Sequence, residues 1–205
     1  MSQEENLKEK ELIITEAARK RFAHFGFSKV TMDEIATDVE MGKASLYYYF
    51  PTKEDLFRAV LAQEMNELKK NIEIILEDSE TATNKLHQYV EQRMKFFQIL
   101  INLGTLSVHS YFDPKSIFKK LFIDFEEVEL NLLRKIFDEG KKNKEFDKKI
   151  NDDTAVVFLH IIQGLRCRVL KQNKGQGIAK ETRENLQNEM NLATDIFING
   201  IKKRK

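Results

Sequence analysis

Residues 31–56 read TMDEIATDVEMGKASLYYYFPTKEDL, and this stretch decides how the first part of the chain folds. Thr31 stands at a helix N-cap position and Glu34 follows three residues later, which is the spacing of a capping box. Val30 and Ile35 stand at the two positions of a hydrophobic staple around the same helix start. A short helix is therefore predicted to begin directly after Thr31.

A second short helix follows the first after a break. Residues 40–42 interrupt the apolar pattern and predict a turn. The next helix covers residues 43–50 and ends before Pro51, because the residue that precedes a proline avoids the α-helical conformation. Leu46 and Phe50 are four residues apart and are expected to face inward. Two short helices joined by a three-residue turn predict a helix-turn-helix.

The outer side of this second helix suits the major groove of DNA. Lys43, Ala44, Ser45, Tyr47 and Tyr48 supply a cation, a hydroxyl, two phenols and a small residue that permits close approach. Thr31, with the amides that it caps, and Lys53 can hold phosphate oxygens. The alternative is that the three tyrosines at 47–49 only pack a small domain, but three consecutive helical residues cannot all point inward.

The quoted stretch resembles the head of the tetracycline-repressor (TetR) family of transcriptional regulators. The resemblance lies in the spacing, the aromatic run and the Lys-Glu-Asp-Leu at 53–56, and it covers about a quarter of the chain. It implies a recognition helix at Lys43–Tyr49, phosphate anchoring by Thr31, Tyr48, Tyr49 and Lys53, and a homodimer formed by the last two long helices. The full set of predicted DNA-binding residues is Thr31, Gly42, Lys43, Ala44, Ser45, Tyr47, Tyr48, Tyr49 and Lys53.

Three positions depart from the family pattern. Glu40 stands where the turn usually holds glycine, Ala44 replaces a common glycine and Tyr49 replaces a common histidine. Glu40 must therefore adopt a less favourable backbone conformation, or the turn must differ. The changes at Ala44 and Tyr49 leave the operator sequence open.

The whole chain is predicted to be all-α, with about nine helices. It contains two prolines and eight glycines among 205 residues, and long helices tolerate neither residue well in their interiors. The predicted domains are a three-helix DNA-binding head at residues 1–51 and a ligand-binding and dimerisation bundle at residues 52–205. Apart from the two short helices, the predicted helices cover residues 6–25, 54–78, 81–103, 114–140, 152–171 and 181–199, and the first of them ends at a left-handed Gly26.

Phenylalanines predict a small-molecule site in the second domain. Most of the fifteen follow residue 90, and large apolar pockets with a few polar groups are typical ligand sites. The alternative is a packed aromatic core. The candidate ligand-binding residues are Arg93, Phe96, Phe97, Tyr111, Phe112, Phe118, Phe122 and Gln163.

The last two long helices carry more apolar residues than a solvated layer needs, and they are predicted to form an isologous four-helix interface in a homodimer. The expected contact side of the first is Val156, Leu159, Gln163, Gly164, Cys167 and Leu170. The expected seam of the second is Leu186, Met190, Ala193, Phe197 and Gly200.

Composition narrows the function classes. The net charge is +1, and residues 1–60 hold nine Lys or Arg against eleven Asp or Glu, so bulk charge does not indicate DNA binding. Cys167 is the only cysteine and the four histidines are scattered, which argues against a metal site, and no catalytic motif indicates an enzyme. No cofactor is expected. The most apolar stretch, 155–165, is too short to span a membrane, so a cytoplasmic protein is expected.

The predicted function is a dimeric repressor that a small apolar or aromatic inducer releases from double-stranded DNA at a near-palindromic operator. One alternative is an activator, or a regulator that responds to a protein partner, because the head would look the same. A more remote alternative is a helical enzyme with no recognisable motif.

Overall fold

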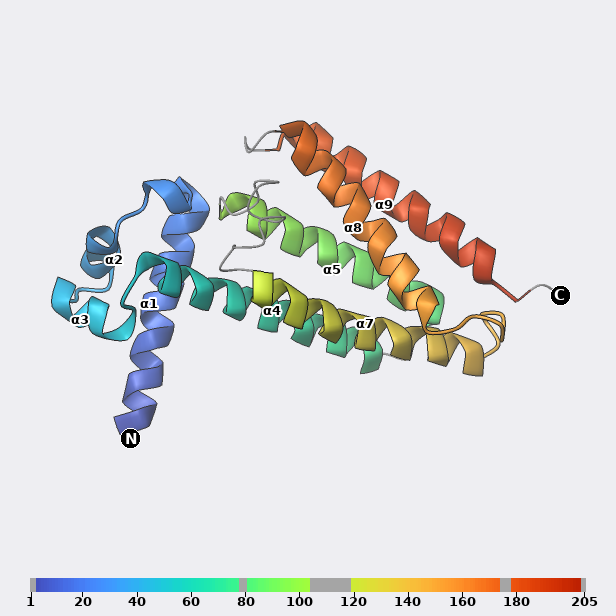
Figure 1. The fold of residues 1–205 in the computed structure, drawn as a ribbon, viewed down its shortest axis with the longest axis horizontal. Coiled ribbons are helices and arrows are strands. Elements are labelled where there is room, and N and C mark those ends of the chain that lie inside the picture. Colours follow the sequence, from blue (N-terminus) through green and yellow to red (C-terminus); the bar gives the residue numbers. More distant parts are fainter. Residues whose placement is uncertain (1–2, 78–80, 104–118, 174–177, 204–205) are drawn as a thin grey trace.

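A computed structural model shows an elongated molecule built from helices (Figure 1). The structure describes residues 3–77, 81–103, 119–173 and 178–203. These residues form eight α-helices and one short 3₁₀ helix, so the all-α prediction is confirmed, with one α-helix fewer in the described ranges than the nine expected. None of the described helices combines the length and apolarity of a membrane span. The elements are α1 (Gln3–Phe25), η1 (Phe27–Lys29), α2 (Met32–Asp38), α3 (Lys43–Tyr49), α4 (Lys53–Glu77), α5 (Ala82–Asn102), α7 (Lys119–Lys142), α8 (Asp153–Asn173) and α9 (Lys180–Ile201).

Helix α4 joins the two ends of the molecule. Its first turns pack against α1, where the rings of Phe22 and Phe57 lie 5.1 Å apart. Further along, α4 packs against α5 and α7. Helices α8 and α9 complete this larger bundle, which is called the body, whereas α1, α2 and α3 form the head (Figure 1). One continuous hydrophobic core, which includes Leu56, Leu61 and Ile72 of α4, runs from the head into the body. Helix α4 therefore takes part in the packing of both parts of the molecule.

The end of α1 depends on Gly26. Its φ of 79° is positive, as the sequence predicts, but its ψ of 150° is extended, so the predicted left-handed helical conformation is wrong. The combination is one that glycine adopts readily, because it has no Cβ. The Gly26 amide donates to the Phe22 carbonyl at 2.8 Å, and the ring of Phe27 lies 5.6 Å from that of Phe22. Phe27 thus folds back onto the last turn of α1, as expected.

The outward faces of α8 and α9 differ from those predicted. Leu159, Leu170, Leu186 and Met190 are buried in the core of the chain itself. A helical stripe of apolar residues shows that a face is covered, but not whether the same chain or a second copy covers it. The large apolar side chains that these two helices expose are Val157, Ile161, Leu192 and Ile196.

The Lys-rich segment after α7 is folded onto three helix ends. Phe146 is buried, and a Cβ on Gly140 would lie 2.2 Å from its ring, so only glycine permits this close approach. The Glu145 carboxylate accepts from the amides of Ala82 and Thr83 at the start of α5. The Asp147 amide donates to the carbonyl of Ile201 at the end of α9. These bonds join residues far apart in the chain, so the composition of the Lys-rich segment does not predict them.

Candidate functional site

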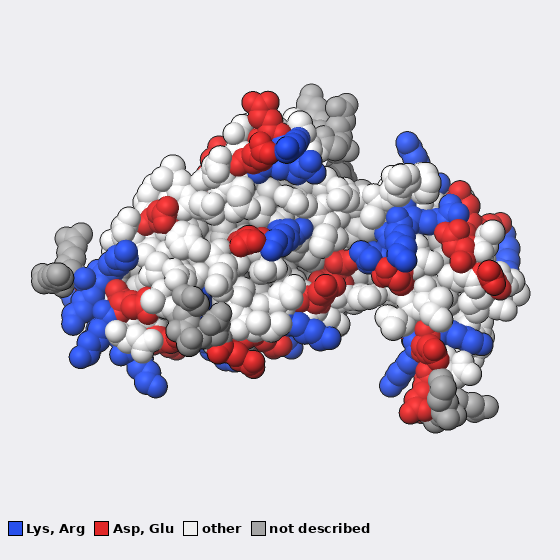
Figure 2. All heavy atoms as spheres, turned by 180° about the vertical axis from the view of Figure 1, so that it is seen from behind, with Lys and Arg blue, Asp and Glu red and all other residues white. Residues whose placement is uncertain are grey.

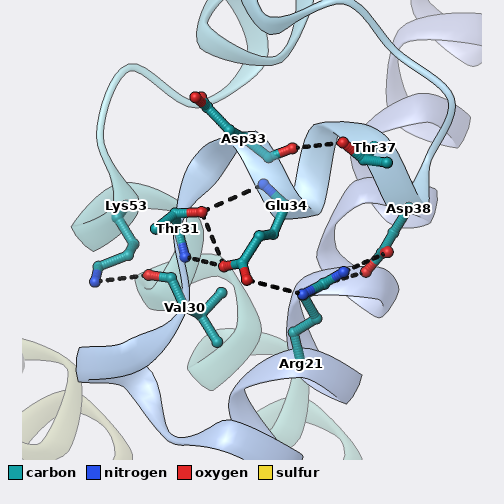
Figure 3. Close-up of polar contacts among 8 residues, drawn as sticks. All are labelled: Arg21, Val30, Thr31, Asp33, Glu34, Thr37, Asp38 and Lys53. Atoms are coloured by element: carbon teal, nitrogen blue, oxygen red, sulfur yellow. Dashed lines mark hydrogen bonds and ion pairs between the residues drawn. The ribbon is translucent and has the colours of Figure 1, made fainter.

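The start of α2 is held by a network that begins at Thr31 (Figure 3). The Glu34 amide donates to Thr31 Oγ1 at 3.4 Å, and Glu34 Oε2 accepts from the Thr31 amide and hydroxyl, both at 2.8 Å. The predicted capping box is confirmed, and the amide of Thr31 holds the pKa of Glu34 below its usual value. Arg21 on α1 pairs with both carboxylate oxygens of Asp38 at the end of α2 and lies 3.4 Å from Glu34. One guanidinium therefore ties both ends of α2 to α1.

The turn between α2 and α3 is strained at Glu40. Its φ is 53°, in the left-handed region that side chains other than glycine rarely adopt. The Met41 amide closes the turn by donating to the Ala36 carbonyl at 2.9 Å. Gly42 is the N-cap residue of α3 and has an ordinary φ of −66°. The first of the two possibilities for Glu40 is thus observed: the turn keeps its shape and Glu40 carries the strain.

Helix α3 presents one polar face to solvent. Leu46 and Phe50 are buried beside Ile35 and Ala36, as predicted. The predicted contact residues Gly42, Lys43, Ala44 and Ser45 are exposed. Tyr48 is 76% exposed and Tyr47 39% exposed. Tyr49 is only half-buried and packs against the core, with its ring 5.4 Å from that of Tyr48. The helix is therefore free to enter a groove.

Lys43 is the one cation of α3, and it already has a partner. Its ammonium lies 2.9 Å from the carboxylate of Asp33 on α2, with both side chains more than half exposed. The hydrogen bond to Asp33 raises the pKa of Lys43 above its usual value. A DNA phosphate must therefore compete with Asp33 for this ammonium.

Lys53 makes contacts that the sequence does not predict. Its ammonium donates to the carbonyl of Val30 at 3.0 Å (Figure 3). It also donates to the carbonyl of Phe27 at 3.0 Å and lies 4.4 Å from the Phe27 ring centre. Lys53 thus closes the segment between α1 and α2. An ammonium has three donors, so one N–H remains for a phosphate.

Acidic and basic side chains alternate over the head (right-hand end of Figure 2). Acidic Asp33 and Asp38 are each paired with a base of the head. Since residues 1–60 carry a net charge of −2, the bulk charge of the head does not favour DNA.

The body contains a small cavity between α5, α7 and α8. Of the predicted ligand-binding residues, Arg93, Phe96, Phe97 and Gln163 line it together. Tyr111, Phe112 and Phe118 lie outside the described residues, and Phe122 lies in α7 but its side chain is outside the description. The cavity volume is about 30 Å³, which is room for roughly two water molecules. Its remaining wall is Leu100, Phe125, Glu126, Glu129, Arg166, Cys167 and Leu170.

Two charged side chains of the cavity wall, Arg93 and Glu129, are deeply buried. Arg93 and Glu129 are 5% and 1% exposed, and Arg93 Nε lies 2.8 Å from Glu129 Oε1. The Tyr89 hydroxyl donates to the same oxygen at 2.7 Å. Burial raises the pKa of Tyr89 well above its usual value, so it stays a donor. At the rim, the Gln163 amide donates to Glu126 at 3.2 Å. The cavity wall is therefore more highly charged than the sequence predicts, with Arg93, Glu126, Glu129 and Arg166 beside its apolar side chains.

The described geometry agrees with known regulators. A family model described as bacterial regulatory proteins, tetR family, matches residues 14–60, which include α2 and α3. The crystal structure of a transcriptional regulator from Cytophaga hutchinsonii aligns with 95% of this chain and 99% of its own, with 40% identity and a TM-score of 0.88. The chain belongs to the TetR family.

Two curated relatives of this TetR-family chain extend the comparison. The HTH-type transcriptional regulator QacR of Staphylococcus aureus is 29% identical over 202 residues, which cover 97% of this chain and 100% of QacR. The HTH-type transcriptional regulator YhgD of Bacillus subtilis is 32% identical over 106 residues, and the match spans 56% of YhgD. The chain is thus a TetR-family helix-turn-helix transcriptional regulator and not an enzyme.

Sequence reasoning missed two buried charges in the cavity wall of this TetR-family chain, Glu129 and Arg166. Glu129 stands four residues after Phe125, and Arg166 three residues after Gln163, so helical spacing places each on the cavity side of its helix. Cys167, predicted to face a second subunit, is half-buried at the cavity wall instead. The signal in the sequence was a charged residue at a position that helical spacing places on an otherwise apolar face.

Proposed function

We propose that this TetR-family regulator is a homodimeric repressor that binds a near-palindromic operator and is released by a small molecule. The exposed face of α3 carries the proposal: Lys43, Ser45 and Tyr48 point to solvent while Leu46 anchors the helix from behind. Such a helix reads base edges in the major groove. Thr31, Tyr48, Tyr49 and the remaining N–H of Lys53 are the proposed phosphate contacts, with Gly42 and Ala44 permitting close approach.

The proposed dimer uses the exposed apolar faces of α8 and α9. Val157 and Ile161 are spaced by one helical turn on α8, as are Leu192 and Ile196 on α9, and α8 packs against α9. Exposed apolar side chains in such a stripe indicate a protein interface. Joined across a two-fold axis, the two helices of each subunit would form a four-helix contact.

The proposed inducer site is the cavity between α5, α7 and α8. Because the cavity holds only about two waters when closed, a ligand must widen it. Both α5 and α7 pack against α4, and α4 packs against α1 of the head. A ligand that prefers the widened form would therefore shift the spacing of the two α3 helices away from the operator geometry.

The proposed units are a DNA-binding head at residues 1–51 and a ligand-binding and dimerisation body at residues 52–205. The core that α4 shares with both supports mechanical coupling between them. The proposal places the protein in the cytoplasm, where its operator DNA lies.

Selection of binding sites from random duplex DNA tests the proposal. We expect a near-palindrome whose half-sites are separated by one turn, about 34–36 Å. Lys43→Ala and Tyr48→Ala should each weaken binding to the selected site by at least about tenfold, since a hydrogen bond to a charged group such as a phosphate contributes about 1.5–3 kcal/mol. Sedimentation should show an unchanged dimer.

Lys180→Ala is the matched control, because Lys180 is exposed at the start of α9, in the body and away from α3. Enrichment of sequences without two-fold symmetry, or normal binding by both α3 variants, would contradict the proposal.

A further inference from the structure

The buried end of the cavity contains an arginine with an unused donor. Arg93 lines the cavity, and within the described part of the chain its Nε hydrogen has no hydrogen-bond acceptor. Glu129 Oε1 is close, at 2.8 Å, but the N–H is not directed at it. A buried donor without an acceptor lowers stability by about 1–3 kcal/mol. The arginine is therefore set up for an acceptor that a ligand can bring.

The surroundings keep this guanidinium charged and in place. The rings of Phe96 and Phe125 lie 5.6 Å and 5.8 Å from its central carbon, which is cation–π distance. Glu129 already accepts from Tyr89, so its carboxylate is not open to a cationic ligand in the way that Arg93 is open to an acceptor. The fork of an arginine matches the two oxygens of a carboxylate.

An ionised acceptor suits Arg93 better than a neutral one. A hydrogen bond between an ionised donor and an ionised acceptor is shorter than one between neutral groups and roughly twice as strong.

We propose that the inducer is an apolar or aromatic carboxylate whose carboxylate is held by Arg93 and whose body lies among Phe96, Phe97 and Leu100. The inference rests on the proposed function, because it names the chemical class of the molecule that occupies the inducer site. The carboxylate supplies the acceptor that the Arg93 Nε hydrogen lacks.

Three probes of equal size and different charge test this inference: phenylacetate, 2-phenylethanol and 2-phenylethylammonium. A ligand that binds only the folded protein raises its melting temperature, and the rise grows with the logarithm of the ratio of ligand concentration to Kd. At matched ionic strength, we expect phenylacetate to raise the Tm at concentrations at least about tenfold lower than the other two, as hydrogen bonds to charged groups contribute about 1.5–3 kcal/mol.

The double substitution Arg93→Met with Glu129→Gln isolates the arginine. It leaves no unpaired charge at this position and keeps an acceptor for Tyr89, so folding is preserved. Phenylacetate binding should fall by about tenfold while binding of the alcohol stays nearly unchanged. The matched control is Arg58→Met with Asp55→Asn, an ion pair of 2.8 Å on α4 that lies outside the cavity wall, and it should keep the preference.

The inference is overturned if the ammonium binds as tightly as the carboxylate, if none of the probes binds at millimolar concentration, or if the double variant keeps the preference. Retardation of operator DNA is measured separately. Binding of phenylacetate without release of DNA would leave the ligand class standing and remove induction from the proposed function. Release of DNA by the alcohol or the ammonium alone would leave induction standing and overturn the carboxylate as the ligand class.

Discussion

Lys43 and Asp33 form an ion pair on the surface proposed to meet DNA, so one carboxylate competes directly with the phosphates. The two groups lie 2.9 Å apart, one at the start of α3 and the other in the first turn of α2. Asp33 also places a negative charge where a phosphate backbone would approach. In the proposed complex, Asp33 therefore lowers the affinity for DNA. In the folded protein, the same carboxylate stabilises the N-terminus of α2 through the helix dipole.

Replacing Asp33 by Asn should strengthen operator binding several-fold. The substitution releases Lys43 for a phosphate, so the dependence of log affinity on log salt should become steeper by about one unit for each added contact. Fluorescence anisotropy over a series of salt concentrations measures both effects. Asp152→Asn makes the same charge change on an exposed residue next to α8 and should alter neither. Weaker binding by Asp33→Asn would show instead that Asp33 positions Lys43.

Glu40 carries backbone strain that glycine would remove. Its φ of 53° raises the free energy of the folded state by about 1–2 kcal/mol, whereas glycine also gains entropy in the unfolded chain. Glu40→Gly should therefore stabilise the protein by about 0.5–1 kcal/mol, which raises the Tm by about 2 °C in a chain of this size.

Glu73→Gly serves as the control, because it should change the stability in the opposite direction. Glu73 is exposed in the interior of α4, where glycine should destabilise by about 1 kcal/mol. Calorimetry of both variants decides the matter, and a lower Tm for Glu40→Gly would mean that the turn is not strained.

Helix α2 has two turns and is held mainly by contacts to its neighbours. Arg21 of α1 pairs with Asp38 at its end and approaches Glu34 in its first turn (Figure 3). Hydrogen bonds from Arg21 hold the pKa of Asp38 below its usual value. A carboxyl whose pKa is lowered on folding stabilises the protein above its unfolded pKa, and this contribution is lost as the pH falls through the folded pKa.

Arg21→Gln should destabilise the protein by about 0.5 kcal/mol at pH 7, the usual range for a solvent-exposed ion pair. The difference from the parent should shrink as the pH falls below the usual Asp pKa of about 3.9, and vanish below the lowered pKa of Asp38 in the folded protein, where that carboxyl is protonated. Urea unfolding of Arg21→Gln, Asp38→Asn and the double variant at several pH values gives the coupling energy. A coupling energy independent of pH would show that the two side chains do not act as an ion pair.

In the proposed dimer, the two heads lie at a fixed separation that the contact between the bodies sets. The exposed apolar side chains of α8 and α9 are the proposed contact between subunits. Figure 2 shows charged side chains gathered at both ends of the molecule, with a broad surface between them where they are sparse.

Ile196→Lys should convert the dimer to monomers and weaken operator binding by more than tenfold, because a charge is placed in a desolvated contact. Ile196 is 64% exposed in the single chain. Ile74→Lys is the control, since Ile74 on α4 is equally exposed, at 65%, but lies outside α8 and α9. Sedimentation velocity measures the mass of each. Dimers of Ile196→Lys, or monomers of both variants, would place the interface elsewhere.

The capping box, the helix-turn-helix and the all-helical fold could be predicted from the sequence because they depend on neighbours along the chain. Thr31 and Glu34 are three residues apart, and the inward Leu46 and Phe50 are four apart. Interactions over one helical turn are set by residue type and spacing alone.

The cavity, the partners of Lys53 and the outward faces of α8 and α9 were decided only by tertiary packing. Lys53 binds carbonyls 23 and 26 residues away, and the cavity joins Arg93, Glu129 and Gln163 from three helices. An apolar stripe specifies that a helix is covered on one side, but the neighbour that covers it depends on how all the helices pack. Leu186 and Met190 therefore lie in the core of the chain, while Leu192 and Ile196 remain outside.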